Sequence, residues 1–129
     1  REVNDSKPNW VLDKVKIAIS DFLQAHPEKT SKDVSIACYG LAFKPDIDDL
    51  RQSPALNIVK QIINTHSGSV FAIEPNISEL PESLNGATLA TLDKALDECD
   101  IHVLLVDHKE FKGAFPKTGL FIDTKGIWG

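Results

Sequence analysis

Short apolar runs alternate with amphipathic segments along the chain. The apolar runs are rich in Val, Ile, Leu and Ala, which is typical of strands that are buried on both faces. Between them, apolar residues recur at helical spacing. We expect strands at 34–39, 70–73, 87–89, 101–106 and 120–122, and helices at 8–25, 54–66, 92–99 and 109–112.

This alternation predicts an α/β fold. We expect a three-layer αβα, Rossmann-like domain whose mainly parallel sheet has about five strands, joined by right-handed crossovers. In such sheets ligands bind at the carboxyl ends of the strands, so the loops that follow the strands are the first places to look for a site.

The first helix is expected to begin at Pro8, because proline is favoured at the first helical position. Residues 1–7 are polar and are expected to be irregular, with Asp5 or Ser6 as the cap. One face of this helix is apolar and consists of Val11, Val15, Ala18 and Phe22.

The loop between the strand at 34–39 and the next helix contains the most distinctive residues. Gly40 supplies a tight turn, but Ala42 stands where a dinucleotide fingerprint has its second glycine, so the fingerprint is absent. The cations Lys44 and Arg51 are present instead, and both side chains suit phosphate groups. The loop is therefore either an anion site built from side chains or a solvated loop whose cations balance the neighbouring aspartates.

Other candidates follow later strands. Glu74 either reads a ribose hydroxyl or is a plain charged residue at a strand exit, and the latter is the simpler interpretation. His108 could bind a ligand, line a subunit contact or cap the short helix after it. Lys125 follows the last strand and so lies on the same sheet edge as Lys44, whereas His102 lies mid-strand and is expected to be structural.

Composition narrows the class of protein. The chain has 129 residues, 42% of them hydrophobic, which is enough for one domain with a real core. A net charge of −5 argues against nucleic acid as a partner, so a phosphate ligand needs local cations. The sequence contains no run of about 18 apolar residues, so we expect no membrane span. The two cysteines lack metal-ligand spacing, so we expect no metal, and free thiols fit a reducing cytoplasm.

Two motifs give the sequence a specific resemblance. The stretch Gly-Leu-Ala-Phe-Lys-Pro at 40–45 and the stretch Asp-Asp-Leu-Arg-Gln-Ser-Pro at 48–54 resemble the signature of the C-terminal domain of nucleotide-sugar 6-dehydrogenases, the UDP-glucose/GDP-mannose dehydrogenase family. The segments 3–8 and 123–128 are similar too, so the resemblance covers essentially the whole chain. The residues at 47–51, 74–77 and 106–108 are most similar to the branch that acts on UDP-N-acetyl-D-mannosamine.

The resemblance implies an NAD-dependent enzyme that oxidises the sugar C6 of a UDP-sugar to the uronic acid. It implies that Phe43, Lys44 and Lys125 contact the UDP-sugar and that Arg51 reaches the pyrophosphate of NAD. The family's catalytic cysteine, lysine and asparagine belong to the preceding domains, and none of them maps here. The chain alone is therefore expected to be inactive, and NAD is expected to be bound mainly outside it.

The resemblance also implies a domain organisation and a setting. Residues 1–7 would be the end of an interdomain linker, and residues 8–129 the UDP-sugar-binding C-terminal domain of a larger, homo-oligomeric enzyme. Such an enzyme is cytoplasmic and serves bacterial surface-polysaccharide synthesis. Alternatives are the same domain of a UDP-glucose or UDP-N-acetyl-glucosamine dehydrogenase and, from another class, a receiver-like or dimerisation module without catalysis.

Overall fold

The computed structural model describes residues 2–41, 54–75, 77, 79–80, 82–106, 108–113 and 119–123. The α-helices are α1 (Glu2–Ala25), α2 (Pro54–Thr65) and α3 (Leu92–Glu98). The strands are β1 (Ile36–Tyr39), β2 (Val70–Ile73), β3 (Thr88–Leu89), β4 (Ile101–Leu104) and β5 (Leu120–Asp123). Three short 3-10 helices complete the set: η1 (Ser31–Asp33), η2 (Glu82–Leu84) and η3 (Lys109–Phe111).

The strands form one five-stranded sheet with the order β3-β2-β1-β4-β5, and every pair is parallel. The chain builds the sheet outward from β1 through β2 to β3, and then returns to the other side of β1 with β4. This confirms the predicted α/β fold and the number of strands. It also creates a switch point between β1 and β4, where open parallel sheets place their ligands.

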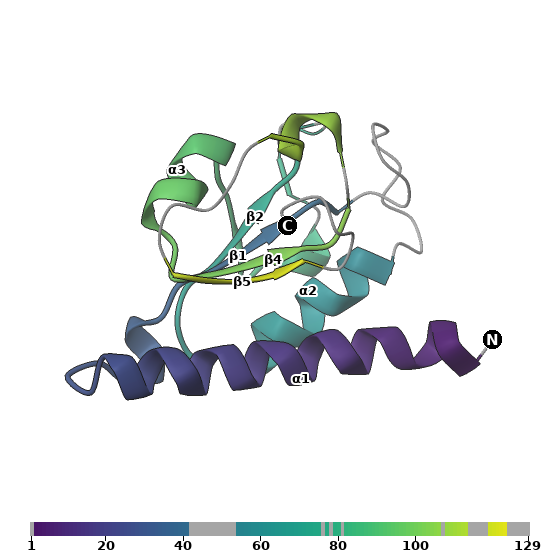
Figure 1. Ribbon diagram of the computed structural model, residues 1–129. Helices are drawn as coiled ribbons and strands as arrows, with labels where there is room; N and C mark the ends of the chain where they lie inside the picture. Colours follow the sequence, from purple (N-terminus) through teal and green to yellow (C-terminus); the bar gives the residue numbers. More distant parts are fainter. Residues whose placement is uncertain are drawn as a thin grey trace.

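Helices cover both faces of the sheet, which gives three layers (Figure 1). The long α1 and the shorter α2 lie on one face, where Val15 and Val59 pack in the same core as Ile36 and Cys38. The other face carries α3 and η3, and its core contains Ala37 and Tyr39. Successive residues of β1 thus enter opposite cores, as the alternation of side chains along a strand requires.

The expected start of the first helix was wrong. The helix begins at Glu2, so Pro8 lies inside α1 and residues 2–7 continue it. Inside a helix a proline removes one i→i−4 hydrogen bond and its ring crowds the carbonyl of residue i−4, at a cost of about 3 kcal/mol, so α1 includes Pro8 despite that cost. The predicted inner face is correct, since Val11, Val15, Ala18 and Phe22 are all buried.

Thr91 confirms the predicted start of α3. Its side-chain oxygen accepts a hydrogen bond from the backbone N–H of Lys94 at 3.3 Å, the usual N-cap arrangement. Among the described residues, no helix has both the length and the apolar character needed to cross a membrane.

Candidate functional site

The ends of β1 and β4 approach each other closely at the switch point. The backbone N–H groups of Leu105 and Val106 both donate to the carbonyl oxygen of Tyr39, at 2.9 and 3.2 Å. Gly40 follows with φ +100°, and a Cβ atom placed on it would lie 2.6 Å from the Cβ of Val106. The predicted tight turn is present, and Gly40 is required both by its φ angle and by the neighbouring strand.

The predicted contact residues lie outside the described part of the chain. Phe43, Lys44 and Arg51 belong to the segment 42–53, and Lys125 to the segment 124–129. The two anchors of the first segment are described: Leu41 is fully buried at the exit of β1, and α2 begins at Pro54. Because α2 leads back to the start of the parallel strand β2, both anchors belong to the carboxyl edge of the sheet.

Glu74 joins three loops at this edge. One carboxylate oxygen, Oε1, accepts hydrogen bonds from the backbone N–H of Leu41 at 2.7 Å and from Nε2 of His108 at 2.9 Å. The side chains of Glu74 and His108 are both fully buried. The carboxylate at the end of β2 is therefore bonded to the loop after β1 and to the loop after β4.

This arrangement corrects the simpler interpretations of both residues. A buried carboxylate with two donors is not a plain charged residue at a strand exit. His108 is the N-cap residue of η3, but its side chain makes no capping hydrogen bond and pairs with Glu74 instead. Its complete burial within the chain also does not fit a residue that lines a subunit contact.

The strand order is what brings this pair together. Glu74 follows β2 and His108 follows β4, and these strands flank β1 on either side. Side chains that leave the carboxyl ends of two such strands can meet over the end of the strand between them. The pair therefore follows from the strand order once that order is known.

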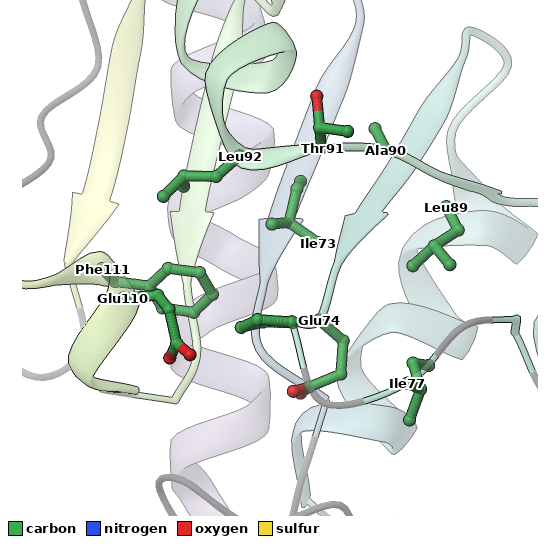
Figure 2. Close-up of a pocket in the computed structure, with 10 residues that line it drawn as sticks. Ile73, Glu74, Ile77, Leu89, Ala90, Thr91, Leu92, Glu110 and Phe111 are labelled. Atoms are coloured by element: carbon green, nitrogen blue, oxygen red, sulfur yellow. The ribbon is translucent and has the colours of Figure 1, made fainter.

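A pocket of about 370 Å³ lies beside this pair, on the α3 side of the sheet. Figure 2 shows Glu110 and Phe111 on one side of it, Leu89 and Ile77 on the other, and Ile73 between them. Of the described residues that line it, Glu74 and Glu110 carry carboxylates and none is basic. These described residues suit an uncharged, largely apolar group better than a phosphate.

The two cysteines are buried and free. Burial, with a smaller Coulombic contribution from Cys99, raises the pKa of Cys38 to about 12. Burial likewise raises the pKa of Cys99 to about 11. Both thiols stay protonated near neutral pH, so neither has the thiolate character of a nucleophile. Among the described residues, no group of three or more His, Cys, Asp or Glu side chains could hold a metal ion.

Comparison with known proteins gives a consistent result. Residues 37–129 match the model of the UDP-glucose/GDP-mannose dehydrogenase family, UDP binding domain. The chain is 53% identical, over 99% of its length, to the UDP-N-acetyl-D-mannosamine dehydrogenase of Salmonella typhi. It is 45% identical, over 99% of its length, to the NDP-N-acetyl-D-galactosaminuronic acid dehydrogenase of Ralstonia solanacearum.

A solved structure supports the same relationship. The native structure of the UDP-N-acetyl-mannosamine dehydrogenase Cap5O of Staphylococcus aureus matches 98% of this chain with a TM-score of 0.72 and 28% identity, over 29% of the length of that structure. The chain likewise spans only 31% of the Salmonella relative and 29% of the Ralstonia relative.

Proposed function

Because the chain belongs to the UDP-glucose/GDP-mannose dehydrogenase family and carries that family's UDP-binding domain, we propose that it holds the nucleotide end of the substrate of an NAD-dependent UDP-N-acetyl-D-mannosamine 6-dehydrogenase. The observation that carries this proposal is the 53% identity to a UDP-N-acetyl-D-mannosamine dehydrogenase, spread over 99% of the chain. The described switch point supports it, since the glycine turn of the signature loop leaves the sheet where a ligand is expected.

The substrate contacts are proposed at three residues. Lys44 and Lys125 would face the diphosphate, and Phe43 would contact the UDP-sugar through its backbone or ring. A chain with net charge −5 attracts a diphosphate poorly as a whole, so these two cations would supply the local positive charge. Arg51 would reach the pyrophosphate of NAD, which is held mainly by other parts of the enzyme.

The role of such a domain in the reaction is positioning. Oxidation of an alcohol to an acid needs a base, a nucleophile for the aldehyde-level carbon and a hydride acceptor. We assign neither the base nor the nucleophile to this chain. Its two buried thiols do not suit the role of the nucleophile. Binding energy from the UDP group would instead hold the sugar C6 at the distant catalytic centre.

We further propose the wider organisation. Residues 1–7 would end an interdomain linker, with residues 2–7 forming the first part of α1, and residues 8–129 would form the UDP-sugar-binding domain. The whole enzyme would be a cytoplasmic homo-oligomer that serves surface-polysaccharide synthesis.

The second candidate is the same domain of a dehydrogenase for another UDP-sugar. The 45% identity to the Ralstonia relative favours it, because the name of that relative gives a different sugar nucleotide.

Calorimetric titration of the chain at low salt tests the proposal. We expect UDP to bind and NAD not to bind, because the dinucleotide fingerprint is absent after β1. Binding of NAD in preference to UDP, or of neither by a folded chain, would contradict a self-contained UDP site. Competition by UDP-N-acetyl-mannosamine against UDP-glucose in the whole enzyme would then decide between the two sugars.

A further inference from the structure

We propose that Glu74 and His108 are positioning residues for the nucleotide site: together they hold the backbone of Leu41, and so set the start of the loop that carries Phe43 and Lys44. This inference rests on the proposed function, because it concerns the same UDP site.

The hydrogen bond between Leu41 and Glu74 comes directly after a backbone hydrogen bond at the end of β1 and β2. Gly40 still donates its N–H to the carbonyl oxygen of Ile73 at 2.8 Å, as a residue at the end of paired strands does. The next N–H, that of Leu41, donates instead to the Glu74 carboxylate at 2.7 Å. Leu41, the last described residue before the segment 42–53, is therefore bonded to a side chain, and the orientation of that side chain affects where the segment starts.

His108 fixes that side chain in turn. Its Nε2 lies 2.9 Å from the same oxygen, Oε1, that accepts from Leu41. Its ring meets Phe111 edge-on, with the ring centroids 5.5 Å apart and the planes at 61°. Packing of η3 thus holds the imidazole, the imidazole holds the carboxylate, and the carboxylate holds Leu41.

The choice of residue types points to function more than to stability. A buried carboxylate is expensive to desolvate, and apolar residues of similar volume would usually serve the core as well or better. The pair lies at the carboxyl edge, beside the switch point, and not in the interior of either helix layer. Lys44 follows Leu41 by only three residues, which can span at most about 10 Å, so the position of Leu41 limits where Lys44 can lie.

Amide hydrogen exchange tests the mechanical part of the proposal. The Leu41 N–H depends on Glu74, whereas the Gly40 N–H depends on the backbone of Ile73 and serves as an internal control. In Glu74→Leu we expect the protection of Leu41 relative to Gly40 to fall about ten-fold to hundred-fold, the loss of one hydrogen bond to a charged group. Glu74→Gln keeps an acceptor oxygen, so the protection of Leu41 relative to Gly40 should fall less in this variant. An unchanged ratio in both variants overturns the proposal.

Titration with UDP tests the functional part. His108→Leu should weaken UDP binding about ten-fold or more, and His108→Gln, whose amide nitrogen can replace Nε2 as a donor, should restore most of the affinity. Glu82→Gln removes an exposed carboxylate from η2, outside the pocket, and is the matched control, with affinity unchanged.

The outcomes separate this proposal from the one before it. Loss of Leu41 protection with unchanged UDP affinity would leave the pair purely structural and overturn the inference while the UDP site stands. Equal weakening by His108→Leu and His108→Gln would also overturn it, since a donor would then make no difference. If the folded wild-type chain binds no UDP, the proposed function fails, and the exchange ratio alone decides whether the pair positions Leu41.

Discussion

The hydroxyl oxygen of Tyr39 lies 2.7 Å from Nδ1 of His102, in the interior on the face of the sheet that α3 covers. His102 pairs in register with Ala37, so Tyr39 is its diagonal neighbour on the same face of the sheet. This contact explains how a histidine is accommodated within an otherwise apolar strand that is buried on both faces. Phe111 completes the environment with an edge-on contact to the Tyr39 ring, at 5.7 Å and 86°.

Tyr39→Phe should therefore reduce stability without changing the fold. The variant removes one buried hydrogen bond and keeps the ring, so we expect the free energy of unfolding to fall by about 1–3 kcal/mol. Urea denaturation measures this. In a double-mutant cycle with His102→Leu, the two changes should be clearly non-additive, because each removes the same interaction. Additive effects would contradict an energetic role for this contact.

The sequence predicts the fold well where a local pattern suffices. Apolar runs such as that in β4 and the helical repeat Val11–Val15–Ala18–Phe22 depend only on neighbours in the chain, and both were identified correctly. The partner of His102 could not be found in this way, because it depends on β1 lying next to β4, a contact across 63 residues. The structural role that we expected for His102 is nevertheless confirmed by its burial and this bond.

The site shows the same division. Gly40 was predicted as a tight turn, and its left-handed φ angle bears this out. The Glu74–His108 pair was not predicted, because it depends on β2 and β4 lying on either side of β1, an order that no local pattern specifies. The roles of Phe43, Lys44, Arg51 and Lys125 come from the family resemblance and stay predictions, because these residues lie outside the described part of the chain.

Gly40→Ala should be more destabilising than the same change at Gly113. Both glycines have positive φ angles, +100° and +82°, so both variants incur the strain of a left-handed residue, about 1–2 kcal/mol. At Gly40 the new Cβ would also collide with Val106, at 2.6 Å, whereas at Gly113 no atom of the described residues lies within 4 Å. We expect the collision to add about 1–3 kcal/mol in urea denaturation. Equal losses at the two positions would show that the close approach of β1 and β4 is unimportant.

Stability should fall in mildly alkaline solution because of the buried thiols. A cysteine with its ordinary pKa of 9.0 ionises in the unfolded chain, whereas burial holds the pKa of Cys38 at about 12 in the folded chain. Above about pH 9 the unfolded state therefore releases a proton that the folded state retains, and unfolding is favoured as the pH rises. Below about pH 9 the thiol of Cys38 is protonated in both the folded and the unfolded chain, so its ionisation does not reduce stability there.

Cys38→Ala should make that pH dependence shallower. Each such thiol contributes a slope of about 1.4 kcal/mol per pH unit between its unfolded and folded pKa values, so the variant should lose about that much slope between about pH 9 and pH 11. Denaturation in the presence of a reductant, at several pH values, measures it. Val103→Ala, beside Cys38 in β4, is the control: it should lower stability at every pH and leave the slope unchanged. The same slope in all three proteins would refute the linkage.

Arg51→Ala separates the cofactor from the substrate. If Arg51 reaches the pyrophosphate of NAD, its loss should raise the KM for NAD in the whole enzyme, by about ten-fold for one charged contact, while UDP binding to the present chain stays the same. Steady-state kinetics and calorimetry give the two readouts. An unchanged dependence on NAD would remove Arg51 from the cofactor site, and a loss of UDP affinity would place it with the substrate instead.

Lys44→Ala should weaken the binding of UDP and leave the binding of NAD unchanged, the reverse of Arg51→Ala. Lys44 lies four residues after the Gly40 turn, and the loop's remaining charges include the acids at 46, 48 and 49, which repel a diphosphate. Removal of this cation should therefore weaken UDP binding about ten-fold, and the effect should shrink in high salt, where such contacts are screened. Lys60→Ala, an exposed lysine of α2, is the matched control for the loss of one positive charge and should leave the affinity unchanged. If both variants weaken UDP binding equally, the diphosphate responds to overall charge, and the assignment of Lys44 as a direct contact is wrong.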